Sequence, residues 1–264
     1  MKKVLVIGAH SYIGEKFKEY VLTKYSEDLK VDMVSASDGA WRIVDFSGYD
    51  TVLHLSGIVH RKEKKDMEDL YYKVNYKLAV EIALRAKESN VNQFIFMSTA
   101  AVYGSYSGCV TKDTLPNPNT FYGKSKLAAE QDIIKLQDDD FKIAIVRPPL
   151  VYGEGCKGNY RRLVKLAKYT PIFPEFHNKR SVIHINNLSN NIVQQIKDRS
   201  NGYFLVQDNE YMDVCTIIEK IRNERRKKTI LIPYFNSFIS YLIHKNMDVI
   251  KKMFGDFYYY KDIK

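Results

Sequence analysis

The chain has 264 residues, a length sufficient for one sizeable core or for a domain with a smaller lobe. Its formal net charge is +10 at pH 7. No stretch approaches the roughly 20 apolar residues that cross a bilayer, and the apolar run that ends at Gly8 is too short for a secretory signal. Three scattered cysteines, Cys109, Cys156 and Cys215, predict neither disulfides nor a zinc site. We therefore expect a cytoplasmic protein without a metal centre.

The first element is the continuous apolar run of residues 4–7, which is typical of a buried parallel strand. It leads into Gly8, Ser11 and Gly14, spaced Gly-x-x-Ser-x-x-Gly ahead of an amphipathic helix. This order leaves free backbone amides at a helix N-terminus, where a pyrophosphate can bind. Ser11 stands where a middle glycine is expected, and we expect it to be tolerated at some cost in how closely phosphate approaches.

The second strand, residues 31–34, leaves the choice of cofactor open. An NAD enzyme is expected to place Asp or Glu at its end, on the ribose hydroxyls. This chain continues instead with Ser35, Ser37 and Asp38. Asp38 would serve NAD if the loop folds back, whereas the two serines and Arg42 would hold the 2′-phosphate of NADP.

Two further stretches could face the nucleotide. Asp45 and Phe46 would place a carboxylate and an aromatic ring against adenine, or simply form a turn after a short strand. Residues 50–57 form another apolar strand whose end lets a cofactor lie close to the backbone, at Leu55, Ser56 and Gly57. We expect His54 within this strand to be a core residue.

Asn75 lies within a helix expected from about residue 67 to residue 88, and we expect it to tie that helix to a loop. Further on, Tyr122 precedes Lys126 by four residues, so both share one face of a helix. An ammonium group beside a phenol favours the phenolate and lowers its pKa from about 10. The hydroxyl of Thr99, in the run Met97-Ser98-Thr99, could hold a substrate oxygen beside it. This set suits proton transfer to and from a sugar alcohol.

These motifs occur together with residues 93–104 and 147–153, in an order that resembles the extended short-chain dehydrogenase/reductase family. More narrowly, the chain is similar to the nucleotide-sugar epimerase/dehydratase branch, of which UDP-glucose 4-epimerase is the best-known type. The resemblance implies an α/β fold with a doubly wound parallel sheet (Rossmann) and a small C-terminal α/β lobe. Residues 1–150 would form the NAD(P)-binding domain, and residues 151–264 a substrate-binding lobe partly interleaved with the sheet.

The resemblance also assigns roles. Tyr122 matches the catalytic base and acid, Thr99 the hydroxyl that holds the sugar oxygen, and Lys126 the residue that lowers the tyrosine pKa and binds the nicotinamide ribose. The pyrophosphate turn matches Gly8, Tyr12, Ile13 and Gly14, and the adenine contacts match Asp45 and Phe46. Asn159 would contact the nucleotide sugar, Phe173 would lie against its base, and Arg180 would bind the diphosphate through its planar fork.

Dehydratases that resemble this branch follow the threonine with Asp and Glu, which move the protons at C5 and C6. This chain has Ala100 and Ala101 there, so we do not expect dehydration. The expected reaction is NAD-dependent 4-epimerisation of a UDP-sugar through a 4-keto intermediate, in the synthesis of surface-polysaccharide precursors. Reduction of a 4-keto nucleotide sugar by NAD(P)H is the alternative, and a non-catalytic NAD(P)-binding member of the fold is the third reading.

The C-terminal part is basic and aromatic. From Cys215 onward there are 11 Lys/Arg against 5 Asp/Glu, densest in residues 222–228; we expect a solvated helix end, with attraction to an anionic membrane or polyanion as the alternative. No nucleic-acid motif accompanies the run. We expect residues 230–241 to pack in the core of the small lobe, with peripheral membrane contact or a homodimer interface as alternatives.

Overall fold

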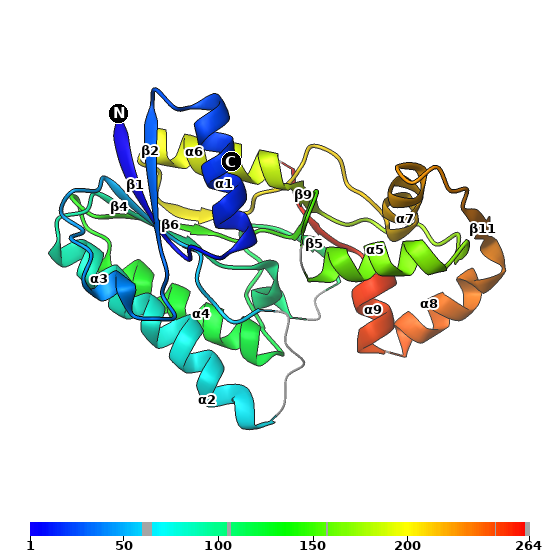
Figure 1. Ribbon diagram of the computed structural model, residues 1–264. Helices are drawn as coiled ribbons and strands as arrows, with labels where there is room; N and C mark the ends of the chain where they lie inside the picture. The colour runs from blue at the N-terminus through cyan, green and yellow to red at the C-terminus, as the bar shows by residue number, and fades with distance from the viewer. Residues whose placement is uncertain (60–64, 105–106, 157, 246, 262–264) are drawn as a thin grey trace.

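Figure 1 shows the computed structural model of the chain, which describes residues 1–59, 65–104, 107–156, 158–245 and 247–261. Its centre is a parallel sheet of six strands. In spatial order these are β10 (Gly202–Phe204), β6 (Lys142–Val146), β4 (Gln93–Met97), β3 (Thr51–His54), β1 (Lys2–Ile7) and β2 (Leu29–Val34). The sheet confirms the predicted doubly wound α/β fold.

Helices cover both faces of this sheet, as parallel strands require. On one face lie α1 (Tyr12–Lys24) and α6 (Ile185–Lys197), and on the other lie α3 (Leu78–Glu88) and α4 (Phe121–Ile133) (Figure 1). Each layer has its own apolar core against the buried strands. The two layers fix the carboxyl ends of the strands along one edge.

The chain reverses direction across the sheet at β1. It moves from β1 to β2 on one side and then returns to β3 on the other. In open α/β sheets a ligand binds in the crevice at such a switch point, outside the carboxyl ends of the strands. The turns after β1 and β3 therefore border the expected cofactor site.

The helix expected over residues 67–88 is present and changes type along its length. The structure has a 3₁₀ turn η2 (Lys65–Met67), a short α2 (Glu68–Tyr71), a π-helical stretch η3 (Tyr72–Lys77) and then α3. Asn75 lies in the π-helical stretch, completely buried, and its side chain accepts from Ile58 N at 2.6 Å and donates to Ile58 O at 3.2 Å. The prediction that Asn75 ties the helix to a loop is confirmed, and so is the helix itself, which differs from expectation only in its π-helical stretch.

A second core lies at the other end of the molecule (Figure 1). Its elements are α5 (Asn159–Tyr169), β8 (Ile172–Pro174), α7 (Val214–Asn223), β11 (Ile230–Ile232), η6 (Pro233–Phe235), α8 (Asn236–His244) and α9 (Asp248–Phe254). Two parallel ribbons stand between the cores, formed by β5 (Gly108–Val110) with β12 (Phe257–Tyr259) and by β7 (Leu150–Tyr152) with β9 (Val182–His184). Short 3₁₀ turns complete the chain at η1 (Ala40–Arg42), η4 (Ala100–Tyr103) and η5 (Ile134–Leu136).

The chain crosses between the two cores more than once. Although α6 and β10 follow residue 150, they pack in the first core, and β10 pairs with β6. The functional division at residue 150 stays a prediction.

Residues 230–241 do not pack as expected. Ile239 is buried at 5% exposure, but Tyr234 is 90%, Phe238 59% and Tyr241 55% exposed. Because α8 lies at the outer end of the molecule, only one side of it meets the second core (Figure 1). Among the described residues, no helix combines the length and apolar character needed to cross a membrane.

Candidate active site

The turn after β1 has the geometry of a phosphate-binding turn. Gly8 adopts a φ of +132°, a conformation that L side chains rarely adopt, and a Cβ there would lie 3.3 Å from Ser56 N. Ser11 caps α1 by accepting from Gly14 N at 3.1 Å. Within the described residues, the amides of Tyr12 and Ile13 have no hydrogen-bond partner, so the first turn of α1 presents two free donors. The serine cap therefore leaves the anion site usable.

The turn after β3 lies directly beside the Gly8 turn. Leu55 N donates to Ile7 O at 2.9 Å, and Ser56 Oγ donates to the same carbonyl at 3.2 Å. A Cβ on Gly57 would lie 3.5 Å from Lys126 Nζ, so the turn reaches the predicted catalytic lysine. The structure thus brings the Gly8 turn, residues 55–57 and Lys126 together.

The predicted adenine contacts are only partly available. Phe46 is 1% exposed and packs in the core between the sheet and α3, with the Arg85 guanidinium 4.9 Å from its ring centre. Its ring has no free face for a base, which corrects the expected aromatic contact. Asp45 is exposed and accepts from Ser47 N at 2.9 Å and from Ser47 Oγ at 2.8 Å, bonds that lower the pKa of its carboxyl.

The expected ribose site follows β2. Ser35 Oγ and Ser37 Oγ lie 3.1 Å apart, and Asp38 Oδ1 accepts from Ala40 N at 3.0 Å. This backbone bond is the main reason why the pKa of Asp38 is lowered. Both an acid and two hydroxyls stand there, so the position suits either a ribose or its 2′-phosphate.

Thr99 and Tyr122 meet as predicted. Thr99 caps η4, its Oγ1 accepts from Ala101 N at 3.1 Å, and its side chain is hydrogen-bonded to the Tyr122 phenol. Tyr122 lies in the first turn of α4, which Thr120 caps. A Cβ on Gly123 would lie 2.5 Å from Ala101 O, so only glycine lets α4 approach η4 this closely.

The protonation of Tyr122 differs from the expectation. Burial raises the pKa of its phenol to about 12, and the bond to Thr99 only partly offsets this. Lys126 is not among the causes of the shift. In the protein alone, desolvation outweighs any charge from the lysine, and the tyrosine is a neutral phenol at pH 7.

Lys126 is 2% exposed and points into the sheet side of α4. Its Nζ donates to Met97 O at 2.8 Å and lies 4.4 Å from the centre of the Phe96 ring. Burial lowers the pKa of this ammonium to about 7, and Glu130 opposes the shift. One donor is engaged by the protein, so the ammonium keeps donors for a ligand in the crevice.

His54 is a core residue, as predicted. Its ring is fully buried, with the rings of Phe94 and Phe96 centred 6.0 and 5.8 Å away. Burial lowers the pKa of the imidazole to about 3, so it is neutral at physiological pH.

One buried ionic network was not predicted from the sequence. Glu130, one turn beyond Lys126, accepts from Arg147 Nη2 at 2.5 Å and from Ser98 Oγ, and Arg147 Nη1 donates to Tyr103 OH at 2.8 Å. Glu130 is 0% and Arg147 7% exposed. This network fixes α4 against the ends of β4 and β6 and thereby positions the catalytic face. The i, i+4 spacing of Lys126 and Glu130 was visible in the sequence, but the partner 17 residues away was not.

The three residues predicted to bind the substrate lie in different surroundings. Asn159 begins α5, and its side chain lies outside the described part of the chain. Phe173 is 3% exposed and packs in the second core, with its ring centre 6.0 Å from that of Phe254. It therefore cannot lie against a nucleotide base, which corrects that prediction.

The Arg180 guanidinium is half-buried and donates to Gly255 O at 2.8 Å. Because no carboxylate of the described residues forms an ion pair with it, it remains suited to an anion.

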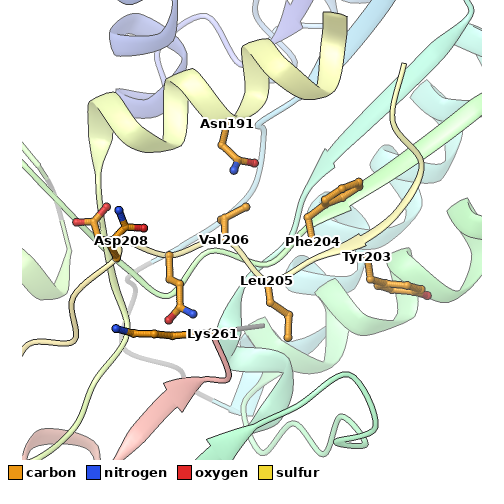
Figure 2. A pocket seen from close by; sticks show the side chains of 9 residues that line it. Asn191, Tyr203, Phe204, Leu205, Val206, Asp208 and Lys261 are labelled. Carbon is orange, nitrogen blue, oxygen red and sulfur yellow. The ribbon is translucent and has the colours of Figure 1, made fainter. Parts of the chain in front are cut away.

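A separate hollow of about 580 Å³ lies at the β10 edge of the sheet, between α6, the segment after β10 and Lys261 (Figure 2). None of the predicted site residues lines it. Asp208 on its wall is held by Tyr152 OH at 2.8 Å and by Asn187 Nδ2 at 2.8 Å. We therefore do not include the hollow in the candidate active site.

The site as a whole fits a dinucleotide. Free amides at the N-terminus of α1 suit a pyrophosphate, the small turn after β3 admits a flat group, and Lys126 borders that turn. The Thr99–Tyr122 pair can hold an oxygen and move its proton. Across the described residues, no three His, Cys, Asp or Glu side chains gather as metal ligands.

Comparison with known proteins points the same way. The family model described as "NAD dependent epimerase/dehydratase family" matches residues 4–191. UDP-glucose 4-epimerase of Vibrio cholerae is 34% identical over 194 residues, which is 69% of this chain and 59% of that protein, so the chain spans under two thirds of this relative.

Two further comparisons cover more of the chain. N-acetyl-alpha-D-glucosaminyl-diphospho-ditrans,octacis-undecaprenol 4-epimerase of Escherichia coli O157:H7 is 23% identical, over 88% of this chain and 75% of that protein. Among solved structures, UDP-glucuronic acid 4-epimerase from Bacillus cereus in complex with NAD matches with a TM-score of 0.71 at 21% identity, over 88% of this chain and 87% of that one. At this identity the structural match supports the fold.

Proposed function

Because the chain belongs to the NAD dependent epimerase/dehydratase family, we propose that it interconverts the 4-epimers of a nucleotide sugar, a UDP-sugar, through a 4-keto intermediate. The observation that carries this proposal is the Thr99–Tyr122 hydrogen bond, made by the same helix α4 that brings Lys126 against the turn after β3. A hydroxyl pair of this kind can hold the C4 oxygen from two sides. The pair of alanines after Thr99 leaves no acid for dehydration.

The roles of the residues follow from their positions. Tyr122 takes the proton of the C4 hydroxyl as the sugar is oxidised and returns it when the ketone is reduced on its other face. Thr99 donates to the same oxygen and orients it. Bound NAD supplies the hydride acceptor and donor. Lys126 would hold the cofactor ribose with its remaining N–H groups. With NAD bound, the positive charges of the nicotinamide and of Lys126 would together favour the Tyr122 phenolate, which does not form at pH 7 in the protein alone.

The free amides of Tyr12 and Ile13 would hold the cofactor pyrophosphate, and Arg180 the diphosphate of the sugar nucleotide. Leu55, Ser56 and Gly57 would line the nicotinamide half of the crevice. Tyr12 OH donates to Glu154 O at 2.9 Å, which ties the phosphate end of the site to the turn ahead of α5.

The test is Tyr122→Phe, which keeps the ring and removes the phenol. We expect epimer formation to fall by about 10² to 10⁴-fold, while cofactor released by denaturation stays unchanged. Tyr169→Phe, at a 73% exposed position, is the matched control and should be fully active. Retained turnover in Tyr122→Phe would refute the assignment.

A second candidate is reduction of a 4-keto nucleotide sugar by NADPH. Ser35 and Ser37, with hydroxyls 3.1 Å apart at the end of β2, favour it because they could hold a 2′-phosphate. Titration of the cofactor-free protein with NADPH and NADH distinguishes the two: a clear preference for NADPH supports the reductase. If cofactor binds but neither sugar substrate turns over, the protein is a non-catalytic member of the fold.

The carrier of the sugar is a further choice. The Escherichia coli relative is named for a sugar on undecaprenyl diphosphate, and a diphosphate beside Arg180 would be common to both carriers. We propose a UDP-sugar first, in the cytoplasmic synthesis of surface-polysaccharide precursors. Turnover of polyprenyl-diphosphate sugars but not UDP-sugars would replace that carrier and leave the chemistry unchanged.

A further inference from the structure

The positive charge of this protein is concentrated in two segments, residues 158–174 and 225–245. They hold nine Lys/Arg and no Asp or Glu, whereas the whole chain has 41 Lys/Arg and 31 Asp/Glu. The rest of the chain, with 32 basic and 31 acidic residues, is nearly neutral. All nine basic side chains are exposed: four on α5, the run Arg225–Lys228, and Lys245 after α8. The net charge therefore belongs to one part of the molecule.

The fold holds these two segments together. Arg222, 5% exposed, donates through Nη1 to Ala167 O at 2.7 Å and through Nη2 to Lys228 O at 2.6 Å. Its guanidinium thus links the end of α5 to the turn after α7. Just beyond, Ile230 pairs with Ile172 in the β8–β11 ribbon. The basic face of α5 and the basic turn are fixed as neighbours.

Large apolar side chains are exposed beside these charges. Ile172 and Ile230 are 49% and 57% exposed on the ribbon, and four aromatic residues follow on η6 and α8: Tyr234, Phe235, Phe238 and Tyr241. The spacing of Tyr234, Phe238 and Tyr241 puts them on one helical face. Lys245 Nζ lies 5.7 Å from the Tyr241 ring centre, and Lys168 Nζ lies 5.1 Å from that of Tyr169. We call these segments the α5–α8 surface.

We propose that the α5–α8 surface docks this protein on an anionic lipid bilayer. Aromatic rings enter the boundary between headgroups and acyl chains, while the long basic side chains reach the headgroup phosphates. A polyanion in water would satisfy the charges but leave the apolar side chains exposed. A second copy would cover the apolar side chains, but a two-fold interface would place the basic residues against each other. A bilayer satisfies both.

Docking is separate from the chemistry, because the α5–α8 surface lies at the end of the molecule away from the six-stranded sheet (Figure 1). Thr99, Tyr122 and Lys126 are not part of it, and the exposed side chains that carry the proposal do not include Asn159 at the start of α5. Through this surface the protein would bind the membrane as a peripheral protein, without a membrane-spanning helix among its described residues. Membrane binding can therefore be measured without reference to turnover.

The test is sedimentation of the full-length protein with phosphatidylcholine vesicles, with and without phosphatidylglycerol. We expect binding only to the anionic vesicles, with release by salt. Lys227→Glu with Lys228→Glu should lower the partition coefficient by about tenfold or more, and Phe238→Ser should also weaken it. The matched controls lie far from this surface: Lys24→Glu with Lys30→Glu for the charge, and Leu22→Ser, 63% exposed, for the apolar loss.

Equal binding by test and control variants would overturn the proposal, as would wild-type protein that stays in solution with anionic vesicles. If Phe238→Ser instead converts a dimer to a monomer in sedimentation velocity and leaves vesicle binding unchanged, the surface is an interface between copies, and the proposal also fails. Circular dichroism confirms that each variant is folded.

Discussion

Lys126 Nζ lies 2.8 Å from the carbonyl oxygen of Met97, the last residue of β4. The ammonium is thus held by a neutral acceptor inside the protein, 2% exposed. Because this ammonium is buried and forms no ion pair with the described residues, its pKa is lowered to about 7. The lysine therefore destabilises the folded state in its charged form, as expected of a residue kept for function.

This arrangement predicts how Lys126→Met changes stability with pH. The lysine pKa is about 7 when folded and about 10.4 when unfolded, so the unfolded chain binds more protons between these values. Wild-type stability should rise with pH across that window. Lys126→Met removes the dependence and should be more stable by on the order of 2 kcal/mol at pH 6.

Denaturant unfolding at pH 6 and near pH 10 measures the gap in unfolding free energy between wild type and Lys126→Met. It should shrink at the higher pH, where the wild-type lysine is neutral in the folded state. A gap of equal size at both pH values would contradict the account. Lys24→Met, at an exposed position on α1, is the control and should show no pH-dependent gain.

The second prediction concerns the phenol of Tyr122. Because burial raises its pKa to about 12, the cofactor-free protein should show no phenolate from this residue below about pH 10. The ultraviolet difference spectrum between wild type and Tyr122→Phe isolates that titration. Added NAD should move it to lower pH, since a positive nicotinamide ring and a charged Lys126 both favour the phenolate. Phenolate near pH 7 without cofactor would refute the assignment of the raised pKa.

The third prediction separates Thr99 from Tyr122. Thr99→Val keeps the shape but removes the hydrogen bond to the phenol and the cap of η4. We expect kcat to fall about 10 to 100-fold, with a smaller change in KM. Thr99→Ser retains the hydroxyl and should stay within a few-fold of wild type. Equal losses in the two variants would mean that the hydroxyl is not the active group.

The fourth prediction concerns the buried ion pair. Glu130→Gln leaves the Arg147 guanidinium buried without its charge partner and should cost about 3 to 5 kcal/mol of unfolding free energy. The surface pair of Lys16 and Glu19, 2.8 Å apart, supplies the control: Glu19→Gln should change stability by less than about 1 kcal/mol. Chemical denaturation at pH 7 measures both. If Glu130→Gln lowered the unfolding free energy as little as Glu19→Gln does, the network would not hold α4 in place.

The local parts of this site could be predicted from the sequence. Gly8 and the residues before it define a strand followed by a helix, and the i, i+4 rule puts Tyr122 and Lys126 on one helix face. Their meeting with Thr99 follows from parallel strands, whose carboxyl ends share an edge. The raised pKa of Tyr122 in the protein alone could not be predicted in this way, because it depends on burial and not on spacing.

Other features depend on contacts far apart in the chain. Phe173 and Phe46 carry the residue type of a ring that stacks on a base, and only the packing of the two cores buries them. Within the π-helical stretch, the Asn75 side chain bonds both Ile58 and Ser125, which lie 17 and 50 residues away in the chain. The exposure of Tyr234 and Phe238 reverses what their apolar character predicts, because α8 has only one neighbouring face to pack against.

The most direct test of the central claim is to incubate the purified protein with a UDP-hexose and no added cofactor or reductant, and to follow the C4 configuration by NMR. We expect both 4-epimers to appear and reach equilibrium, because the hydride taken from C4 is returned to the same sugar. A protein that leaves every UDP-hexose unchanged, yet reduces a 4-keto nucleotide sugar with NADPH, would contradict it.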